Sequence, residues 1–147
     1  MRSFEDFSVG EIIALRNYEV TQDEMIEFAQ RYDPQLYHTD PIEAQKSPFG
    51  SLIASGWLTT AIFMRMQCDS FMSDSSCVGS PGVDEIRWLN PVRAGDILHG
   101  VNEVVKVAPS RSRPDRGTVY SQVTISNQHD THVMTLTTRA IYLCRRQ

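Results

Sequence analysis

The chain has 147 residues, of which 41% are hydrophobic and 22% are charged, a balance typical of a folded domain and unlike that of disordered or collagen-like chains. Fourteen basic and eighteen acidic residues give a formal net charge of -4, so the chain lacks the overall positive charge that would attract nucleic acid or an acidic membrane. No apolar run reaches the roughly 18 residues of a membrane-spanning helix, and acidic residues near the start argue against a signal peptide. We therefore expect a single cytoplasmic domain over residues 1–147.

The first predicted elements are a strand and two helices. Residues 12–20 favour a strand, and residues 21–24 (TQDE) then show the T-x-x-E pattern of a capping box, which begins a helix. Pro34 ends this helix, because a proline disfavours the helical backbone of the residue before it, here Asp33. An Asp-Pro pair has the pattern of an N-cap and first helical position, and it predicts one further helical turn over residues 42–45.

The remaining elements are one apolar helix and several strands. Residues 57–68 (WLTTAIFMRMQC) are apolar on nearly every face, which predicts a helix that is buried on most sides. Turn residues divide the rest of the chain into predicted strands over residues 83–89, 97–107, 118–126 and 133–143. These elements favour an α+β fold, in which a mostly antiparallel meander of strands wraps around one central helix.

The segment between the first two helices carries the densest group of chemically active side chains. Asp33 and His38 are five positions apart across a turn that Pro34 restricts, so both side chains can converge on one water molecule. The plainer interpretation is a helix cap beside a structural histidine, and the pair alone does not decide between the two.

Three blocks in the same order resemble the (R)-specific enoyl-CoA hydratases, or MaoC-like acyl dehydratases, which have the hotdog fold. Asp33 and His38 match the ends of the family's D-x-N-P-x-H stretch. Residues 49–57 (FGSLIASGW) resemble its F-G-x-x-I-A-x-G segment, which leads into the central helix. Residues 84–96 (DEIRWLNPVRAGD) resemble its D-x-x-R-x-x-x-P-V-x-x-G-D strand and turn. Together the blocks cover most of residues 28–96.

The sequence departs from the family pattern at two places near the expected site. Gln35 and Leu36 occupy the positions where the family usually has Asn-Pro, and Ser55 occupies a position where many members have His. Gln35 still offers a donor and an acceptor, but its longer side chain places them elsewhere. We expect Gln35 and Ser55 to lie in the substrate-binding region, with Ser55 also capping the central helix.

The resemblance implies the reversible addition of water across the 2,3 double bond of an enoyl-CoA, which gives a 3-hydroxyacyl-CoA. Asp33 would activate the water, and His38 would hold the same water and shuttle or donate a proton. The backbone N–H of Gly56, at the positive end of the central helix, would meet the enolate oxygen.

Four arginines are candidates for binding coenzyme A, because guanidinium groups pair well with phosphate. They are Arg87, Arg93, Arg111 and Arg113. For the last two, which lie in a predicted hairpin loop, a solvated loop is the plainer interpretation.

The resemblance also implies a homodimer, or a dimer of dimers, with the acyl tunnel between subunits. One hotdog sheet leaves an exposed edge, which is consistent with such pairing. No separate cofactor is expected, since coenzyme A is part of the substrate. A metal site at Asp33, His38 and Asp40 is disfavoured, because no second histidine lies nearby at helical spacing.

Two other functions remain open. An acyl-CoA thioesterase on the same fold would use a carboxylate on the central helix, but residues 56–67 contain no acidic side chain. A non-catalytic protein that binds acyl thioesters is the second alternative, and the glutamine at position 35 keeps it open.

Overall fold

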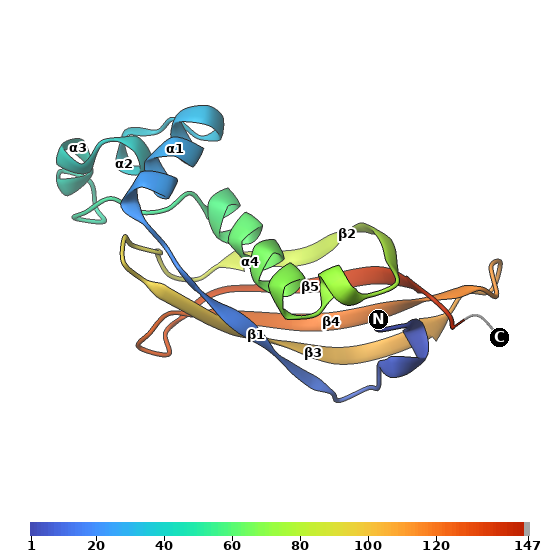
Figure 1. The fold of residues 1–147 in the computed structure, drawn as a ribbon. Helices are drawn as coiled ribbons and strands as arrows, with labels where there is room; N and C mark the ends of the chain where they lie inside the picture. Colours follow the sequence, from blue (N-terminus) through green and yellow to red (C-terminus); the bar gives the residue numbers. More distant parts are fainter. Residues whose placement is uncertain (146–147) are drawn as a thin grey trace.

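In the computed structural model, which describes residues 1–145, a five-stranded antiparallel sheet curves around one long helix (Figure 1). The strands are β1 (Ile12–Glu19), β2 (Cys77–Trp88), β3 (Ile97–Pro109), β4 (Arg116–Ser126) and β5 (His132–Leu143). The helices are α1 (Gln22–Tyr32), α2 (Leu36–Thr39), α3 (Pro41–Gln45) and α4 (Gly56–Ser70), with 3-10 turns at Phe4–Asp6 and Met72–Asp74. The α+β architecture expected from the sequence is confirmed, with α4 as the central helix.

The strands lie in the order β1-β3-β4-β5-β2, and all neighbouring pairs are antiparallel. β3, β4 and β5 form the expected meander, but β2 pairs with β5 at one edge of the sheet and not with β3, which follows it in the chain. The prediction of a simple meander is therefore wrong for β2. Residues 89–96 are too long for a tight hairpin, and they carry the chain across to β3 beside the segment that precedes α4.

Local capping sets the boundaries of the short helices. The Thr21 hydroxyl accepts from the Glu24 N–H at 3.3 Å, as the capping-box pattern predicts, but the Glu24 carboxylate accepts from the Tyr18 hydroxyl at 2.6 Å instead of reaching back to the cap. This second bond ties α1 to β1. Asp40 caps α3 by accepting from two backbone N–H groups, as expected. α2 was not predicted from the sequence, and it carries His38.

The central helix is covered by the sheet on one side only. Its buried side chains include Leu58, Ile62, Phe63 and Met66. The prediction that this helix is buried on most sides is wrong within a single chain, because Trp57 is 58% exposed and Met64 is 44% exposed. With Ala61, these side chains form an exposed stripe at helical spacing. No helix in the described part of the chain is long and apolar enough to cross a membrane.

The core under α4 has two apolar clusters, with buried polar side chains near their boundary. On β4, the inward-facing Val119 and Val123 belong to two separate apolar clusters, and Ser121 lies between them. Thr138 on β5 is paired with Ser121, and Asn102 on β3 is paired with Val123, the next inward residue of β4. Asn102 is only 2% exposed, and its Oδ1 atom has no hydrogen-bond partner within residues 1–145.

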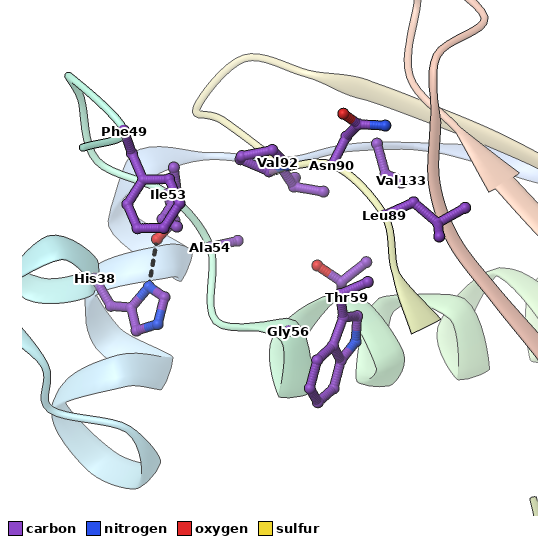
Figure 2. A pocket seen from close by; sticks show the side chains of 12 residues that line it. His38, Phe49, Ile53, Ala54, Gly56, Thr59, Leu89, Asn90, Val92 and Val133 are labelled. Atoms are coloured by element: carbon purple, nitrogen blue, oxygen red, sulfur yellow. Dashed lines mark hydrogen bonds between the residues drawn. The ribbon is translucent and has the colours of Figure 1, made fainter. Parts of the chain in front are cut away.

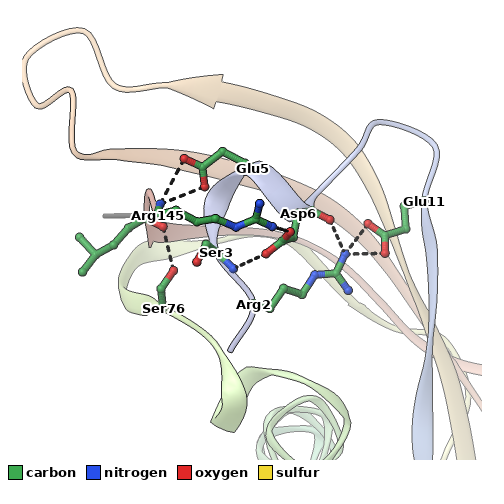
Figure 3. Close-up of polar contacts among 8 residues, drawn as sticks. Arg2, Ser3, Glu5, Asp6, Glu11, Ser76 and Arg145 are labelled. Atoms are coloured by element: carbon green, nitrogen blue, oxygen red, sulfur yellow. Dashed lines mark hydrogen bonds and ion pairs between the residues drawn. The ribbon is translucent and has the colours of Figure 1, made fainter. Parts of the chain in front are cut away.

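The two ends of the described chain are held together by ion pairs at the end of the sheet away from α1 (Figure 3). Arg2 binds both carboxylate oxygens of Glu11, and its guanidinium lies 4.1 Å from the centre of the Phe7 ring. Arg145 pairs with Asp6. The N-terminal turn is thereby joined both to Glu11, directly before β1, and to the segment that follows β5.

Replacing Asn102 with leucine should stabilise the protein. The substitution removes the unpartnered buried oxygen, whose burial costs about 1–3 kcal/mol, and keeps a side chain of similar shape. We expect a rise of about 1 kcal/mol in the free energy of unfolding, measured by urea titration with circular dichroism. Asn102→Ala is the control, because it removes the same oxygen but leaves a cavity and should destabilise. A less stable Asn102→Leu protein would contradict the assignment of an unpartnered oxygen.

Candidate active site

Asp33 and His38 meet because the chain reverses directly after α1. Asp33 follows the last helical residue with a backbone that is neither helical nor extended (φ -152°, ψ 67°), and its N–H still donates to the Ala29 carbonyl at 2.8 Å. Gln35 donates its N–H to the Asp33 carbonyl at 2.8 Å, which tightens the turn before α2. The His38 Nε2 atom consequently lies 3.4 Å from Asp33 Oδ2. The structure thus brings together the two side chains that the sequence pattern selected.

The His38 ring is held in a defined orientation and tautomer. The residue is 6% exposed, and its Nδ1 atom lies 2.8 Å from the Ile53 carbonyl oxygen (Figure 2). A carbonyl oxygen can only accept, so Nδ1 carries the proton in this bond. The Nε2 atom, which faces Asp33, is therefore the atom that can take up or release a proton.

The Asp33 carboxylate is bound at both oxygens. The Gln35 side-chain amide donates to Oδ1 at 2.7 Å, and the Ser55 hydroxyl donates to Oδ2 at 2.7 Å. Partial desolvation raises the pKa of Asp33, but the hydrogen bonds from Gln35 and Ser55, with the charge of His38, outweigh it, so the pKa is lowered below its usual value. Asp33 is therefore ionised at neutral pH.

A mainly apolar pocket of about 310 Å³ lies beside this pair (Figure 2). Its lining consists of His38, Phe49, Ile53, Ala54, Gly56, Thr59, Trp88, Leu89, Asn90, Pro91, Val92 and Val133. His38 is the one titratable side chain in that set. Gly56 is the first residue of α4, and no hydrogen-bond acceptor for its N–H is found within residues 1–145. The pocket therefore combines an apolar wall, an imidazole and a free N–H at the positive end of a helix.

Gly56 is also required for packing, which the sequence did not indicate. A Cβ atom at this position would lie 2.4 Å from the Trp88 ring. Trp88 is held there by edge-to-face packing against Trp57, with ring centroids 5.1 Å apart, and by a bond from its Nε1 to the Thr60 hydroxyl at 3.3 Å. Glycine thus allows Trp88 to form one wall of the pocket.

Ser55 has a second contact that sequence reasoning missed. Its hydroxyl accepts from the Trp57 N–H at 3.3 Å, which is the expected helix cap, and it also donates to Asp33. Ser55 is fully buried. The only signal in the sequence was its position directly before Gly56 in the motif.

The four arginines do not gather at the pocket. Arg93 donates to the Phe49 carbonyl and to the Ser51 hydroxyl, so it braces the loop that precedes the pocket. Arg87 is exposed and pairs with Glu85. Residues 111 and 113 lie in the loop between β3 and β4, at the end of the sheet away from α1–α3 (Figure 1). Within one chain, the structure therefore leaves all four arginines outside the lining of the pocket.

Asp40 is engaged elsewhere, since its carboxylate caps α3. Within residues 1–145, no group of three or more His, Cys, Asp or Glu side chains is arranged to hold a metal ion.

Comparisons with known proteins give a consistent result. Residues 7–127 match the family described as the MaoC like domain. A MaoC-like dehydratase from Rhodospirillum rubrum has a similar structure, with a TM-score of 0.90, 35% identity and coverage of 99% of both chains. A 3-hydroxyacyl-thioester dehydratase Z from Mycobacterium tuberculosis is 28% identical over 133 residues, which cover 85% of this chain and 88% of the relative. An (R)-hydratase from A. caviae has a TM-score of 0.73 at 21% identity, over 95% of this chain and 98% of its own, which supports the fold alone.

Replacing Gly56 with alanine should destabilise the protein through Trp88. The added methyl group would occupy the space of the indole ring, and we expect a loss of about 1–3 kcal/mol in the free energy of unfolding. Urea titration followed by circular dichroism measures this loss. A double variant, Gly56→Ala with Trp88→Leu, should recover part of it because the smaller side chain relieves the overlap. Unchanged stability of the single variant would mean that the ring moves aside without cost.

Proposed function

We propose that this chain, which belongs to the MaoC-like family of dehydratases and hydratases, adds water reversibly across the 2,3 double bond of an enoyl-CoA to give a 3-hydroxyacyl-CoA. The observation that carries the proposal is the distance of 3.4 Å between His38 Nε2 and Asp33 Oδ2, next to a pocket that also contains the first residue of α4. The reaction needs a base, an acid and a donor for an oxyanion, and Asp33, His38 and Gly56 are suited to these three roles.

Asp33 is the base in the hydration direction. Its lowered pKa keeps the carboxylate ionised, and its Oδ2 atom faces His38, so a water molecule that contacts both side chains from the substrate side can lose a proton to Asp33. As the proton leaves, the water oxygen forms a bond to C3 of the enoyl group. The electrons of the double bond move toward the thioester carbonyl and give an enolate.

His38 completes the proton balance. When its Nε2 atom is protonated, it can donate this proton to C2 of the enolate, while Nδ1–H remains bound to the Ile53 carbonyl. The step leaves Asp33 protonated and His38 neutral. Because the two atoms are 3.4 Å apart, the proton can return from Asp33 to His38 and restore the starting state. Dehydration follows the same steps in reverse.

Gly56 stabilises the charge that develops on the thioester oxygen. Gly56 lines the pocket, and its N–H lies at the positive end of α4, a helix of 15 residues, with no acceptor found within residues 1–145. In other enzymes, removal of one such donor costs roughly 2.7–4 kcal/mol of transition-state stabilisation. The apolar side chains of the pocket, among them Val92 and Val133, supply a surface for the acyl chain.

The two alternative functions find less support. A thioesterase would need a carboxylate on α4 directed at the thioester carbon, and the only acidic residue of that helix, Asp69, is near its far end and pairs with Arg65 at 2.8 Å. A purely binding protein would not need a buried imidazole beside an ionised carboxylate, an arrangement that is typical of catalytic sites.

We further propose that the protein acts as a homodimer in the cytoplasm. The exposed stripe of α4, with Trp57, Ala61 and Met64, lies on the same molecule as an edge strand, β2, whose side chains are nearly all exposed. A second copy can cover the stripe and the edge together. If they stay uncovered, an apolar stripe and an open strand edge both favour aggregation.

The activity is tested with crotonyl-CoA, by following enoyl absorbance and free thiol together. Hydration removes the absorbance without releasing thiol, whereas a thioesterase releases thiol and a binding protein changes neither. Asp33→Asn and His38→Ala should each lower kcat by a factor on the order of 100 or more, and the double variant should be little worse than either. His99→Ala is the control, since His99 pairs with Asp130 outside the pocket. Near-native rates in either single variant would contradict the mechanism.

The dimer is tested by placing a charge in the exposed stripe. Met64→Arg should shift the mass measured by light scattering from two chains to one, because a buried unpaired charge opposes association. Ile42→Arg, at an exposed apolar residue on α3, should leave the mass unchanged. A native protein that elutes as one chain at micromolar concentration would refute the dimer.

A further inference from the structure

The Asp33 carboxylate is held by hydrogen bonds from two residues outside the catalytic pair. Its Oδ2 atom accepts from the buried hydroxyl of Ser55, but its Oδ1 atom accepts from Gln35, whose side chain is exposed. An exposed glutamine has several rotamers and can present either end of its amide. The charge of the carboxylate disfavours Oε1 at this place, but a second contact must still select the rotamer in which Nε2 reaches it.

Tyr37 supplies that selection. Its hydroxyl donates to the Gln35 Oε1 atom. A tyrosine hydroxyl that donates in this way fixes the carbonyl end of the amide, and the amino end is then directed at Asp33. The reversed amide would place a partial negative charge against the carboxylate.

The position of the Tyr37 hydroxyl is itself well defined. The Tyr37 ring packs edge-on against the His38 ring, with centroids 4.4 Å apart, and against Phe49 at 5.5 Å. Its backbone carbonyl accepts from the Ile53 N–H at 3.1 Å. The exposed amide is thus anchored to a hydroxyl that the packed part of the site holds in place.

We propose that Tyr37 and Gln35 form a positioning pair, in which the Tyr37 hydroxyl orients the Gln35 amide so that it holds and stabilises the Asp33 carboxylate. This inference rests on the proposed function of Asp33 as the base. Neither residue touches the reacting atoms. Tyr37 acts through Gln35, and Gln35 acts through Asp33.

The pair gives a physical reason for glutamine at position 35. The side chain must reach both Asp33 Oδ1, two residues before it, and the Tyr37 hydroxyl, two residues after it. Asparagine is one methylene shorter and cannot extend its amide as far. The extra length of Gln35, compared with the Asn of the related pattern, is therefore matched by a hydroxyl at position 37.

The test compares Tyr37→Phe, Gln35→Met and the double variant with the native protein. Phenylalanine keeps the packed ring and removes only the donor, and methionine keeps the length of glutamine without its amide. Tyr32→Phe is the matched control, because Tyr32 is adjacent to Asp33 but its hydroxyl makes no hydrogen bond within residues 1–145. The first measurement is the titration of the Asp33 carboxyl carbon by NMR in protein labelled at aspartate, with Asp33→Asn identifying the signal.

The sign of the expected change follows from the bond that is lost. A hydrogen bond donated to the carboxylate favours the ionised form, so its removal raises the pKa of Asp33. The titratable group that faces Asp33 is His38 on α2, and it is unchanged in every variant; Ser55, from the segment before α4, carries no charge. The Asp33 titration should move to higher pH in Tyr37→Phe and in Gln35→Met, and the double variant should move no further than Gln35→Met.

The second measurement is the rate with crotonyl-CoA. We expect kcat to fall roughly three- to tenfold in Tyr37→Phe with little change in KM, and the acidic limb of the kcat profile to move with the NMR titration. An unchanged Asp33 titration in Tyr37→Phe, or additive shifts in the double variant, would overturn the pairing. If the titration moves as expected but native protein does not hydrate enoyl-CoA, the positioning pair stands and the proposed function fails.

Discussion

The hydrogen bond between His38 Nδ1 and the Ile53 carbonyl joins the two segments from which the candidate site is made. One segment follows α1 and brings Asp33 and His38 together, and the other leads into α4 and ends at Gly56. Ile53 also donates its N–H to the Tyr37 carbonyl and forms an isolated bridge with Arg93, so it connects α2, the start of α4 and the crossing segment before β3. The tautomer of the imidazole, the position of the carboxylate and the wall of the pocket all depend on this point of contact.

Local rules predicted much of the fold. Most of the strands, the central helix and the Asp40 cap follow from periodicity and capping chemistry within a few residues, and the structure confirms them. The exception is β2, which begins at Cys77 and not at residue 83 as predicted. The edge position of β2 and the exposed stripe of α4 depend on which distant segments pack together, and no local pattern encodes that. The site shows the same division. The motif selected Asp33 and His38, but the contacts of Ser55 and Trp88 join segments that are more than 20 residues apart in the chain.

Charge alone was a poor guide to location. Arg111 and Arg113 suit phosphate chemistry, but a turn between two long strands places them at the far end of the sheet from α1–α3. By contrast, the two departures from the related sequence pattern are informative together. Gln35 and Ser55 are the donors to the two oxygens of the Asp33 carboxylate, so both departures concern one side chain. The Asp33 carboxylate thus has one neutral donor at each of its two oxygens.

The order of the strands also governs when the pocket can form during folding. β2 ends at Trp88, which is a wall of the pocket, but its partner in the sheet is β5, about 50 residues later in the chain. Pairings between such distant segments close large loops and form late, because the chain loses entropy on closing the loop before the new contacts stabilise it. β2 therefore stays without its partner until β5 has been synthesised. Nascent chains that stop within β4 carry the Asp33 and His38 motif but cannot assemble the pocket around it.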